Sequence, residues 1–427
     1  MKLIVEKSQL RGAVEIPASK SHSVRAAVFA TLAEGESTVR SPLDSLDTQA
    51  AVGACQALGA EFAITPGGDW RVKGAGGKLA APENVIDVMN SGTTLYIVMS
   101  TAALIHGWTV LTGDASIRRR PADRLLKCLN DLGAEAFSTR GNDCCPLVIQ
   151  GPLKGGRTSL EAITSQWLTS LLINCPLAQG GSNIDVPLLN EAPYVRMTLD
   201  WLDYLGIRYE HDEAMKRFHI PGRQSYKAFE RRVPGDFSTA TFFLAAGAAL
   251  DAEIELRGLD MEDSQGDKAV VDYVQQFGAA VNVKPEAGSI AVKRAELRGC
   301  ELDLNATPDA LPAMAVAAAL AEGETRLLNV PQARVKETDR LAVMNAELTK
   351  MGARIEELED GLIVQGGSLR GAKLNGHHDH RVVMSLALAG MAAEGRTEID
   401  TAESVAVTFP GFVEKMQALG ARIQLSE

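Results

Sequence analysis

The sequence predicts an α/β protein made of two similar lobes, and three observations lead to this prediction. An apolar residue followed by Gly closes a helical stretch six times, and the six glycines are 68 to 74 residues apart. A second small residue ends an Ala/Leu-rich helical stretch in each interval, so each unit holds two helices. At 427 residues the chain exceeds what one hydrophobic core usually serves, so the six units are expected to group three and three.

The units are expected to share one order of elements: strand, helix, strand, helix, strand and strand. Glycine takes the left-handed conformation that ends a helix at little steric cost, and strand-forming residues follow. The first mark, after the second helix, stands at Gly59, Gly133, Gly206, Gly278, Gly352 and Gly420. The second mark is interpreted as the end of the first helix, at Gly35, Gly107, Gly181, Ala252, Gly323 and Gly395.

The first helix of each unit is expected to begin at small polar or charged residues. Taken singly, such residues are N-caps, because their side chains accept hydrogen bonds from the first amides of a helix. Equivalent helices in pseudo-symmetric units run parallel, so their N-termini attract a ligand with several negative charges between the lobes. The starts are Ser19-Lys20-Ser21, Asn90-Ser91-Gly92-Thr93, Thr164-Ser165-Gln166, Asp236-Phe237-Ser238-Thr239, Pro308-Asp309-Ala310 and Asp379-His380-Arg381.

Composition and charge exclude several classes of partner. The formal charge of −11 and a pI near 5.3 argue against nucleic-acid and membrane-surface partners, which need a wide basic field. No signal peptide and no run of about 20 apolar residues is present, so a cytoplasmic location is expected. The six cysteines contain no CxxC pair and are expected to be reduced and structural.

Cations gather at several helix starts. Lys20 and Arg25 lie at the beginning of an Ala-rich helix, and residues 118–120 are three arginines before another. A cationic cluster at a helix start opposes the helix dipole, so at least one of these arginines is expected to meet an anionic ligand. The alternative interpretation is that each of these cations lies on a solvent-exposed helix face and binds no ligand.

Residues 334–340 carry five charges at a predicted helix start. We expect Lys336 and Arg340 to lie one turn apart on one side of that helix, with Glu337 beside them. A carboxylate beside two cations that hold an anionic substrate is typical of acid/base chemistry. The run at 377–381 is not favoured as a metal site, because it lacks an HExxH pattern and Arg381 would repel the ion.

No P-loop, GxGxxG, GxSxG or metal-ligand pattern is present. Group transfer between small, multiply charged molecules remains, with closure of the lobes excluding water. Several motifs together resemble the 5-enolpyruvylshikimate-3-phosphate synthase family over essentially the full chain. They are Pro17-Ala18-Ser19-Lys20-Ser21 with Arg25, Asn90-Ser91-Gly92-Thr93-Thr94, Arg120-Pro121, Ser165-Gln166, Pro308-Asp309, Lys336-Glu337-Thr338-Asp339-Arg340 and Asp379-His380-Arg381. The last two, in this order, are highly specific together.

The resemblance implies transfer of an enolpyruvyl group from phosphoenolpyruvate to the 5-hydroxyl of shikimate 3-phosphate, without a cofactor or metal. It assigns shikimate 3-phosphate to Lys20, Ser21, Arg25, Thr164, Ser165, Gln166, Tyr194, Asp309, Gln332 and Lys336. It assigns phosphoenolpyruvate to Lys20, Gly92, Arg120, Gln166, Arg340 and Arg381. Asp309 would be the base for the 5-hydroxyl, and Glu337 with Lys20 would manage the methylene proton and the leaving phosphate. Which group protonates carbon stays open.

The resemblance also implies a two-domain inside-out α/β barrel of six βαβαββ repeats, three per lobe, with helices inside a shell of sheets. One lobe would span 17–234 and the other 1–16 plus 235–427, with the active site in the cleft between them. The protein is expected to be a monomer. Gly92, lying against phosphoenolpyruvate, would leave room for the competitive inhibitor glyphosate.

Three residues depart from the family pattern. Tyr96 stands where the family usually has Arg, Glu191 where many members have Ser near the substrate phosphate, and Val407 where the enterobacterial form has Lys. A carboxylate near a phosphate lowers affinity unless it faces away or pairs with a cation.

Two alternative functions stay open. One is that of a UDP-N-acetylglucosamine enolpyruvyl transferase, which is disfavoured because residues 114–117 lack its reactive Cys. The other is a catalytically silent paralogue that binds an anionic metabolite.

Overall fold

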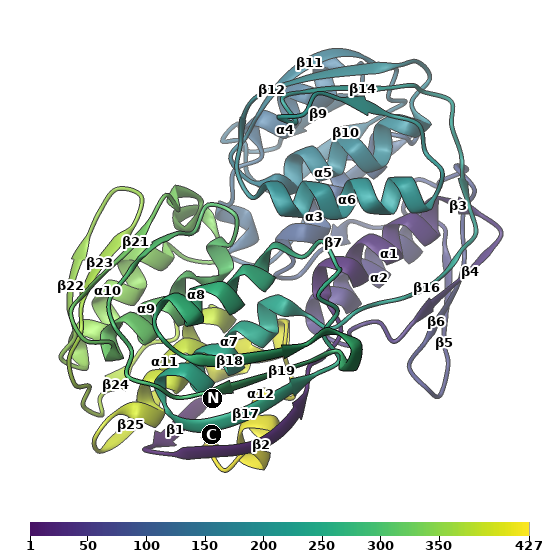
Figure 1. Ribbon diagram of the computed structural model, residues 1–427. Helices are drawn as coiled ribbons and strands as arrows, with labels where there is room; N and C mark the ends of the chain where they lie inside the picture. Colours follow the sequence, from purple (N-terminus) through teal and green to yellow (C-terminus); the bar gives the residue numbers. More distant parts are fainter. Residues whose placement is uncertain (427) are drawn as a thin grey trace. The chain divides into compact units, whose positions relative to one another are not determined.

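The computed structural model describes residues 1–426, which divide into two compact units. We call Ala18–Val233 the N-terminal unit, and Met1–Pro17 together with the residues from Pro234 onward the C-terminal unit. Both are mixed α/β structures (Figure 1).

The N-terminal unit has six helices and three four-stranded sheets. Its helices are α1 (Lys20–Leu32), α2 (Leu46–Ala57), α3 (Gly92–Ala102), α4 (Asp123–Asp131), α5 (Ser165–Asn174) and α6 (Ala192–Tyr204). The first sheet is β16 (Glu230–Arg232), β4 (Glu36–Arg40), β6 (Trp70–Lys73) and β5 (Glu61–Ile64). The second is β7 (Ile86–Asp87), β8 (Trp108–Thr112), β10 (Leu147–Gln150) and β9 (Glu135–Ser138). The third is β11 (Gly156–Ala162), β12 (Ser182–Leu189), β14 (Arg217–Ile220) and β13 (Glu210–His211). A short pair joins β3 (Ala33–Glu34) and β15 (Tyr226–Lys227).

The C-terminal unit repeats this plan. Its helices are α7 (Phe237–Ala249), α8 (Val270–Gln276), α9 (Leu311–Leu320), α10 (Arg340–Lys350), α11 (His380–Ala392) and α12 (Phe412–Ala418). One sheet is β2 (Gln9–Glu15), β17 (Asp251–Arg257), β19 (Ser289–Lys293) and β18 (Ala280–Lys284). The next is β20 (Glu301–Asp303), β21 (Glu324–Leu328), β23 (Leu362–Gln365) and β22 (Arg354–Glu357). The last is β24 (Lys373–Leu374), β25 (Arg396–Ile399), β1 (Lys2–Glu6) and β26 (Arg422–Ser426).

All six four-stranded sheets share one pairing pattern, a parallel pair followed by two antiparallel partners. A parallel pair needs a crossover connection, and one buried helix supplies it between β7 and β8, β11 and β12, β20 and β21, and β24 and β25.

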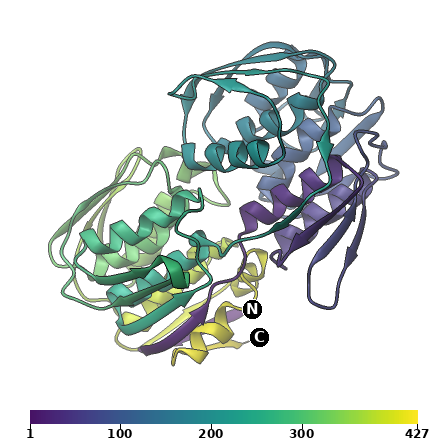
Figure 2. The same cartoon turned by 45° about the vertical axis from the view of Figure 1, so that its right-hand side comes forward.

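Three strands lie far from their neighbours in sequence. β2 precedes α1 yet pairs with β17 in the C-terminal unit, whereas β16 precedes α7 yet pairs with β4 in the N-terminal unit. β1 lies between β25 and β26, with Leu3 opposite both Ile399 and Leu425. The two ends of the chain therefore meet in one sheet, as Figure 2 shows.

The two glycine marks have different roles. Each glycine of the first mark directly follows the last turn of a second helix with φ between 70° and 106°, which confirms its prediction as a helix end. The interpretation of the second mark was wrong, because the first helices end three to seven residues before it. Most of them leave into extended backbone, as at Leu250 with ψ 171°, so no left-handed residue is needed there. Gly35 instead takes φ 97° where the chain enters β4.

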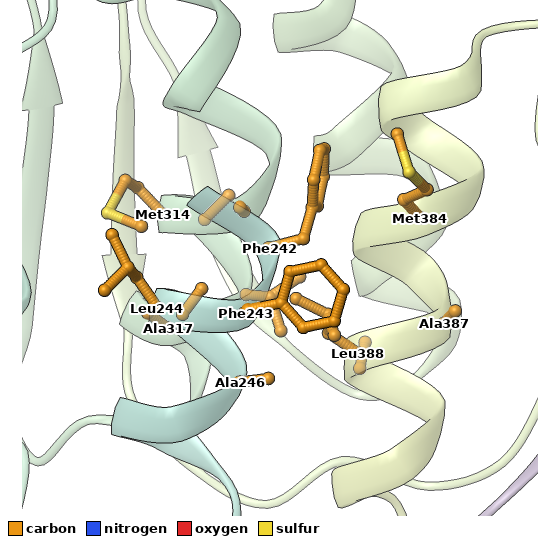
Figure 3. Close-up of a cluster of buried hydrophobic side chains, with 14 of the residues drawn as sticks. Phe242, Phe243, Leu244, Ala246, Met314, Ala317, Met384, Ala387 and Leu388 are labelled. Carbon is orange, nitrogen blue, oxygen red and sulfur yellow. The ribbon is translucent and has the colours of Figure 1, made fainter. Parts of the chain in front are cut away.

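The first helix of each repeat is buried on nearly all sides, whereas the second buries one face. A helix that is apolar or small-residued all round belongs in a core. In the C-terminal unit α7, α9 and α11 pack on one another, and Phe242 and Phe243 of α7 belong to the same buried cluster as Met314 of α9 and Leu388 of α11 (Figure 3). In the N-terminal unit α3 packs against α1 and α5.

The six cysteines form no disulfide, as predicted. Within residues 1–426, no helix combines the length and apolar character that a membrane span requires.

Candidate active site

In the N-terminal unit, the first turns of helices α1, α3 and α5 carry candidate substrate-binding residues. Their N-caps are Ser19, Ser91 and Thr164, which confirms the predicted helix starts. The Gln166 side chain of α5 donates to Thr93 Oγ1 of α3 over 3.0 Å, so these two starts lie side by side.

Arg25 is a buried cation held by neutral groups. Its guanidinium donates to the Thr198 hydroxyl over 2.9 Å and to the carbonyl oxygens of Ser21 and Tyr194, both over 3.0 Å. A longer bond of 3.3 Å reaches Thr169. Burial lowers the pKa of Arg25 to about 10, so it stays charged at neutral pH. Because these four partners carry no formal charge, the positive charge of Arg25 is available to attract a carboxylate.

Lys20 lies 3.2 Å from a carboxylate oxygen of Asp47, and both side chains are mostly buried. Asp47 is in the first turn of α2, which begins with a capping box of Ser45 and Thr48. Sequence reasoning missed Asp47, although the Ser-x-x-Thr pattern before an Ala-rich stretch could have located this helix start. An anionic ligand at Lys20 would therefore share that cation with Asp47.

Gly92 and Arg120 lie against each other. A Cβ atom added to Gly92 would be 2.3 Å from Nη1 of Arg120. One turn after Gly92, the Tyr96 hydroxyl donates to the Pro121 carbonyl over 2.8 Å, and its ring packs edge-on against Trp167. Tyr96 thus ties α3 to the segment that carries Arg120. Burial raises the pKa of Tyr96, so its hydroxyl stays protonated as a donor.

Glu191 does not face away from the start of α5. Its Oε2 atom accepts hydrogen bonds from the Ser165 amide (3.0 Å), the Ser165 hydroxyl (2.6 Å) and the Thr164 hydroxyl (3.3 Å). Glu191 is the N-cap of α6 and has a left-handed backbone with φ 56°. The donors that the family resemblance assigns to a substrate phosphate therefore contact a carboxylate of the protein.

Arg340 is the centre of a charged cluster in the C-terminal unit. Its guanidinium contacts Asp309 over 2.7 Å, Glu337 over 2.6 Å and Asp379 over 2.8 Å. Arg381 contacts the other oxygen of Asp309 over 3.0 Å. Burial alone would lower the pKa of Arg340, but the three carboxylates raise it above the ordinary value. Four of the predicted site residues, Asp309, Glu337, Arg340 and Arg381, are thus joined by direct contacts. The ion pair of Asp379 with Arg340 was not predicted, because the sequence position of Asp379 indicated only an N-cap.

The prediction that Lys336 and Arg340 share one side of a helix was wrong. α10 begins only at Arg340, and its N-cap Asp339 accepts a hydrogen bond from the amide of Ala342 over 3.1 Å. The preceding residues form a short 3₁₀ turn, η6 (Pro331–Val335), and Lys336 follows it with ψ −146°, outside the helical range. The contact between Arg334 and Asp339, 2.7 Å, holds this segment in its non-helical path.

Gln332 and Lys336 lie before the helix that begins at Arg340. Gln332 is buried in η6, and its amide donates to the Asn305 carbonyl over 2.8 Å. Lys336 is half-buried. Val407 is buried in η7 (Ala402–Val407).

His380 is buried next to this cluster. Burial lowers its pKa to about 3, assisted by Arg381 and opposed by Glu337, so the imidazole is neutral at physiological pH. Neither ring nitrogen has a hydrogen-bond partner among residues 1–426.

Comparison with known proteins identifies the family. Residues 4–416 match the profile of the family EPSP synthase (3-phosphoshikimate 1-carboxyvinyltransferase). The 3-phosphoshikimate 1-carboxyvinyltransferases of Acetivibrio thermocellus and Ruminiclostridium cellulolyticum are 54% and 51% identical to this chain, over the full length of each protein. The structure of EPSP synthase from Acinetobacter baumannii aligns over all of both chains with a TM-score of 0.83 and 28% identity. The chain belongs to the EPSP synthase, or 3-phosphoshikimate 1-carboxyvinyltransferase, family.

Proposed function

We propose how the residues of the two units divide the reaction of this family between them. The reaction transfers the enolpyruvyl group of phosphoenolpyruvate to the 5-hydroxyl of shikimate 3-phosphate and releases phosphate, in the biosynthesis of aromatic amino acids. Both substrates carry several negative charges. The chain offers buried or half-buried cations at or near helix starts in both units, namely Lys20, Arg25, Arg120, Arg340 and Arg381.

In this proposal the N-terminal unit holds the carboxylate and the phosphate of shikimate 3-phosphate, and residues of both units contact its ring. Arg25, with Ser21, binds the carboxylate, because its charge is fixed in place by neutral acceptors. Thr164 and Ser165 bind the phosphate at the start of α5, where amide and hydroxyl donors converge. The ring hydroxyls are contacted by Gln166, Tyr194, Asp309, Gln332 and Lys336, with Lys20 near the reacting hydroxyl.

Phosphoenolpyruvate binds to Lys20, the Gly92 amide, Arg120, Gln166, Arg340 and Arg381. The contact between Arg120 and Gly92 supports this assignment, because it places a guanidinium beside the first amides of α3. Arg340 is surrounded by carboxylates, so the substrate anion must take over one of its contacts on binding.

Asp309 is the base that accepts the proton of the 5-hydroxyl. This assignment rests on one observation: Arg340 and Arg381 each hold one oxygen of the Asp309 carboxylate, which fixes its orientation. Glu337, with Lys20, manages the proton at the methylene carbon and the departing phosphate. Positioned proton transfer contributes typically ~10²–10⁴-fold, and orientation of two reactants can supply ~7–11 kcal/mol, so binding both anions is the larger effect.

The resemblance to the EPSP synthase family also suggests the fold of each unit and the state of the enzyme. We propose that each unit is an inside-out α/β barrel, supported by the buried first helices of its three repeats. Residues of both units act on one pair of substrates. The enzyme is a cytoplasmic monomer that requires no cofactor.

Release of phosphate tests the function. Wild-type protein is mixed with phosphoenolpyruvate and either shikimate 3-phosphate or UDP-N-acetylglucosamine, and turnover is expected only with the first acceptor. Asp309→Asn should lower kcat by at least ~10²-fold. The control is Asp303→Asn, an exposed carboxylate at the end of β20, which should leave kcat unchanged. Turnover with the nucleotide sugar alone would assign a different acceptor, and binding of both substrates without turnover would indicate a silent paralogue.

A further inference from the structure

The carboxylate of Glu191 lies where the proposed function places a substrate phosphate. One of its oxygens accepts three hydrogen bonds, from the amide and hydroxyl of Ser165 and the hydroxyl of Thr164. The Glu191 residue is 1% exposed. Negative charge is favourable at a helix N-terminus, so the start of α5 stabilises this carboxylate. The carboxylate is thus an anion of the protein itself bound to these donors.

The backbone aims Glu191 at this position. Its φ of 56° and ψ of 39° are left-handed, a conformation that residues with a side chain rarely adopt. The neighbouring Asn190 fixes it there, because the Asn190 amide donates to the Ala162 carbonyl over 3.1 Å and its side chain donates to the Ile163 carbonyl over 3.2 Å. The start of α6 is therefore attached to the segment that leads into α5.

We propose that Glu191 competes with the phosphate of the acceptor for the donors of Thr164 and Ser165, and so determines how strongly the enzyme distinguishes phosphorylated from unphosphorylated acceptors. The inference rests on the proposed function, in which these donors bind that phosphate. Two anions cannot share one set of donors without strong repulsion, so the Glu191 side chain must leave when the phosphate binds. Affinity for a phosphorylated acceptor is reduced by the contacts that Glu191 gives up.

The test compares two acceptors that differ only in the phosphate. Dissociation constants for shikimate 3-phosphate and for shikimate are measured by calorimetry on wild type, Glu191→Gln and Glu191→Ser. Gln keeps an acceptor oxygen without the charge, and Ser empties the position. The control is Glu161→Gln, an exposed carboxylate on β11 that pairs with Arg124.

Both Glu191 variants should bind shikimate 3-phosphate at least tenfold more tightly than wild type, with Ser at least as effective as Gln. Affinity for shikimate and the KM for phosphoenolpyruvate should change less than twofold, and Glu161→Gln should match wild type. Equal changes for both acceptors would indicate a merely structural role and overturn the proposal. Weaker binding of shikimate 3-phosphate would also overturn it, because Glu191 would then assist the phosphate.

Failure of the proposed function gives a different result. In that case wild type would release no phosphate from phosphoenolpyruvate with shikimate 3-phosphate, whatever residue stands at position 191. Ser165→Ala examines the shared premise, since it should weaken binding of shikimate 3-phosphate and leave shikimate unaffected. Unchanged binding of shikimate 3-phosphate by Ser165→Ala would overturn the proposal, because Glu191 would then hold donors that the phosphate does not use.

Discussion

Replacing Arg340 with Met should destabilise the C-terminal unit strongly. The guanidinium is buried and contacts Asp309, Glu337 and Asp379 at 2.6 to 2.8 Å. Met fills a similar volume but removes the cation that the three neighbouring carboxylates share, and Asp309 keeps its ion pair with Arg381. Removing one partner of a buried ion pair typically costs about 3–5 kcal/mol, because the remaining charge is uncompensated. We expect the free energy of unfolding at pH 7 to fall by about 4 kcal/mol.

The matched control is Arg334→Met. Arg334 also contacts two carboxylates, Asp339 at 2.7 Å and Glu357 at 2.9 Å, but its side chain is 26% exposed. Arg334 is partly exposed and also donates to the carbonyls of Leu358 and Glu359, so this variant should lose some stability but clearly less than Arg340→Met. Unfolding in urea is followed by far-UV circular dichroism, since all four Trp residues lie in the N-terminal unit.

The difference in the free energy of unfolding between wild type and Arg340→Met should become smaller at acidic pH. Burial is the largest influence on Asp379 and opposes its ionisation, but the charge of Arg340, its hydrogen bond and the neighbouring His380 together lower the pKa of Asp379. A carboxyl group with a lowered pKa stabilises the wild type above its unfolded pKa, and this contribution is lost as the pH falls through the folded pKa. In the variant the carboxylates repel one another, so protonation stabilises it as the pH falls from 7 to 5. If Arg340→Met lost less than about 1 kcal/mol of unfolding free energy at pH 7, the reasoning would be refuted. It would also be refuted if the difference in unfolding free energy from wild type were as large at pH 5 as at pH 7.

Three further predictions concern single contacts. In Gly92→Ala the new methyl group would displace the end of the Arg120 side chain. The KM for phosphoenolpyruvate and the inhibition constant of glyphosate should therefore rise, with thermal stability nearly unchanged. An unchanged inhibition constant would count against the proposed phosphoenolpyruvate site. Tyr96→Phe loses the 2.8 Å hydrogen bond to Pro121, so about 1 kcal/mol of stability should be lost and the KM for phosphoenolpyruvate, not for shikimate 3-phosphate, should increase in steady-state assays. The pKa of His380, about 3 when folded, is below the ordinary value of about 6.5, so stability should fall as pH drops below 6.5, by roughly 2 kcal/mol at pH 5. His380→Leu should lose that part of the pH dependence in urea unfolding, and an unchanged slope would show that the imidazole is not the cause.

Features that depend on neighbouring residues could be predicted from the sequence. The left-handed glycine after each second helix and the side-chain caps at Ser19, Ser91 and Asp379 are set by steric freedom and by amides within one turn. The exchange of β2 and β16 between the sheets of the two units involves partners more than 190 residues away, and no local pattern reports such pairing.

The charged residues show the same limit. Helical spacing predicted one face for Lys336 and Arg340, but Asp339 caps the helix at Arg340 and pairs with Arg334, so the segment before it is not helical. Spacing could not indicate the contacts of Asp47 and Glu191, because each side chain reaches a residue of a different helix, and only the family resemblance pointed to position 191. A motif thus identifies which side chains are charged, and the tertiary fold decides which charges meet.

A carboxylate of the protein is present at several of the proposed anion-binding positions in both units. Asp47 contacts Lys20, Glu191 contacts Ser165, and three carboxylates surround Arg340. Buried cations and converging amide donors without a counter-charge would destabilise the unliganded fold. In the proposed function the same carboxylates must yield to substrate anions, so each one that stabilises the unliganded chain would reduce substrate affinity. Stability and affinity therefore oppose each other at these positions, and a substitution that strengthens binding of a substrate anion is expected to lower the free energy of unfolding without ligand.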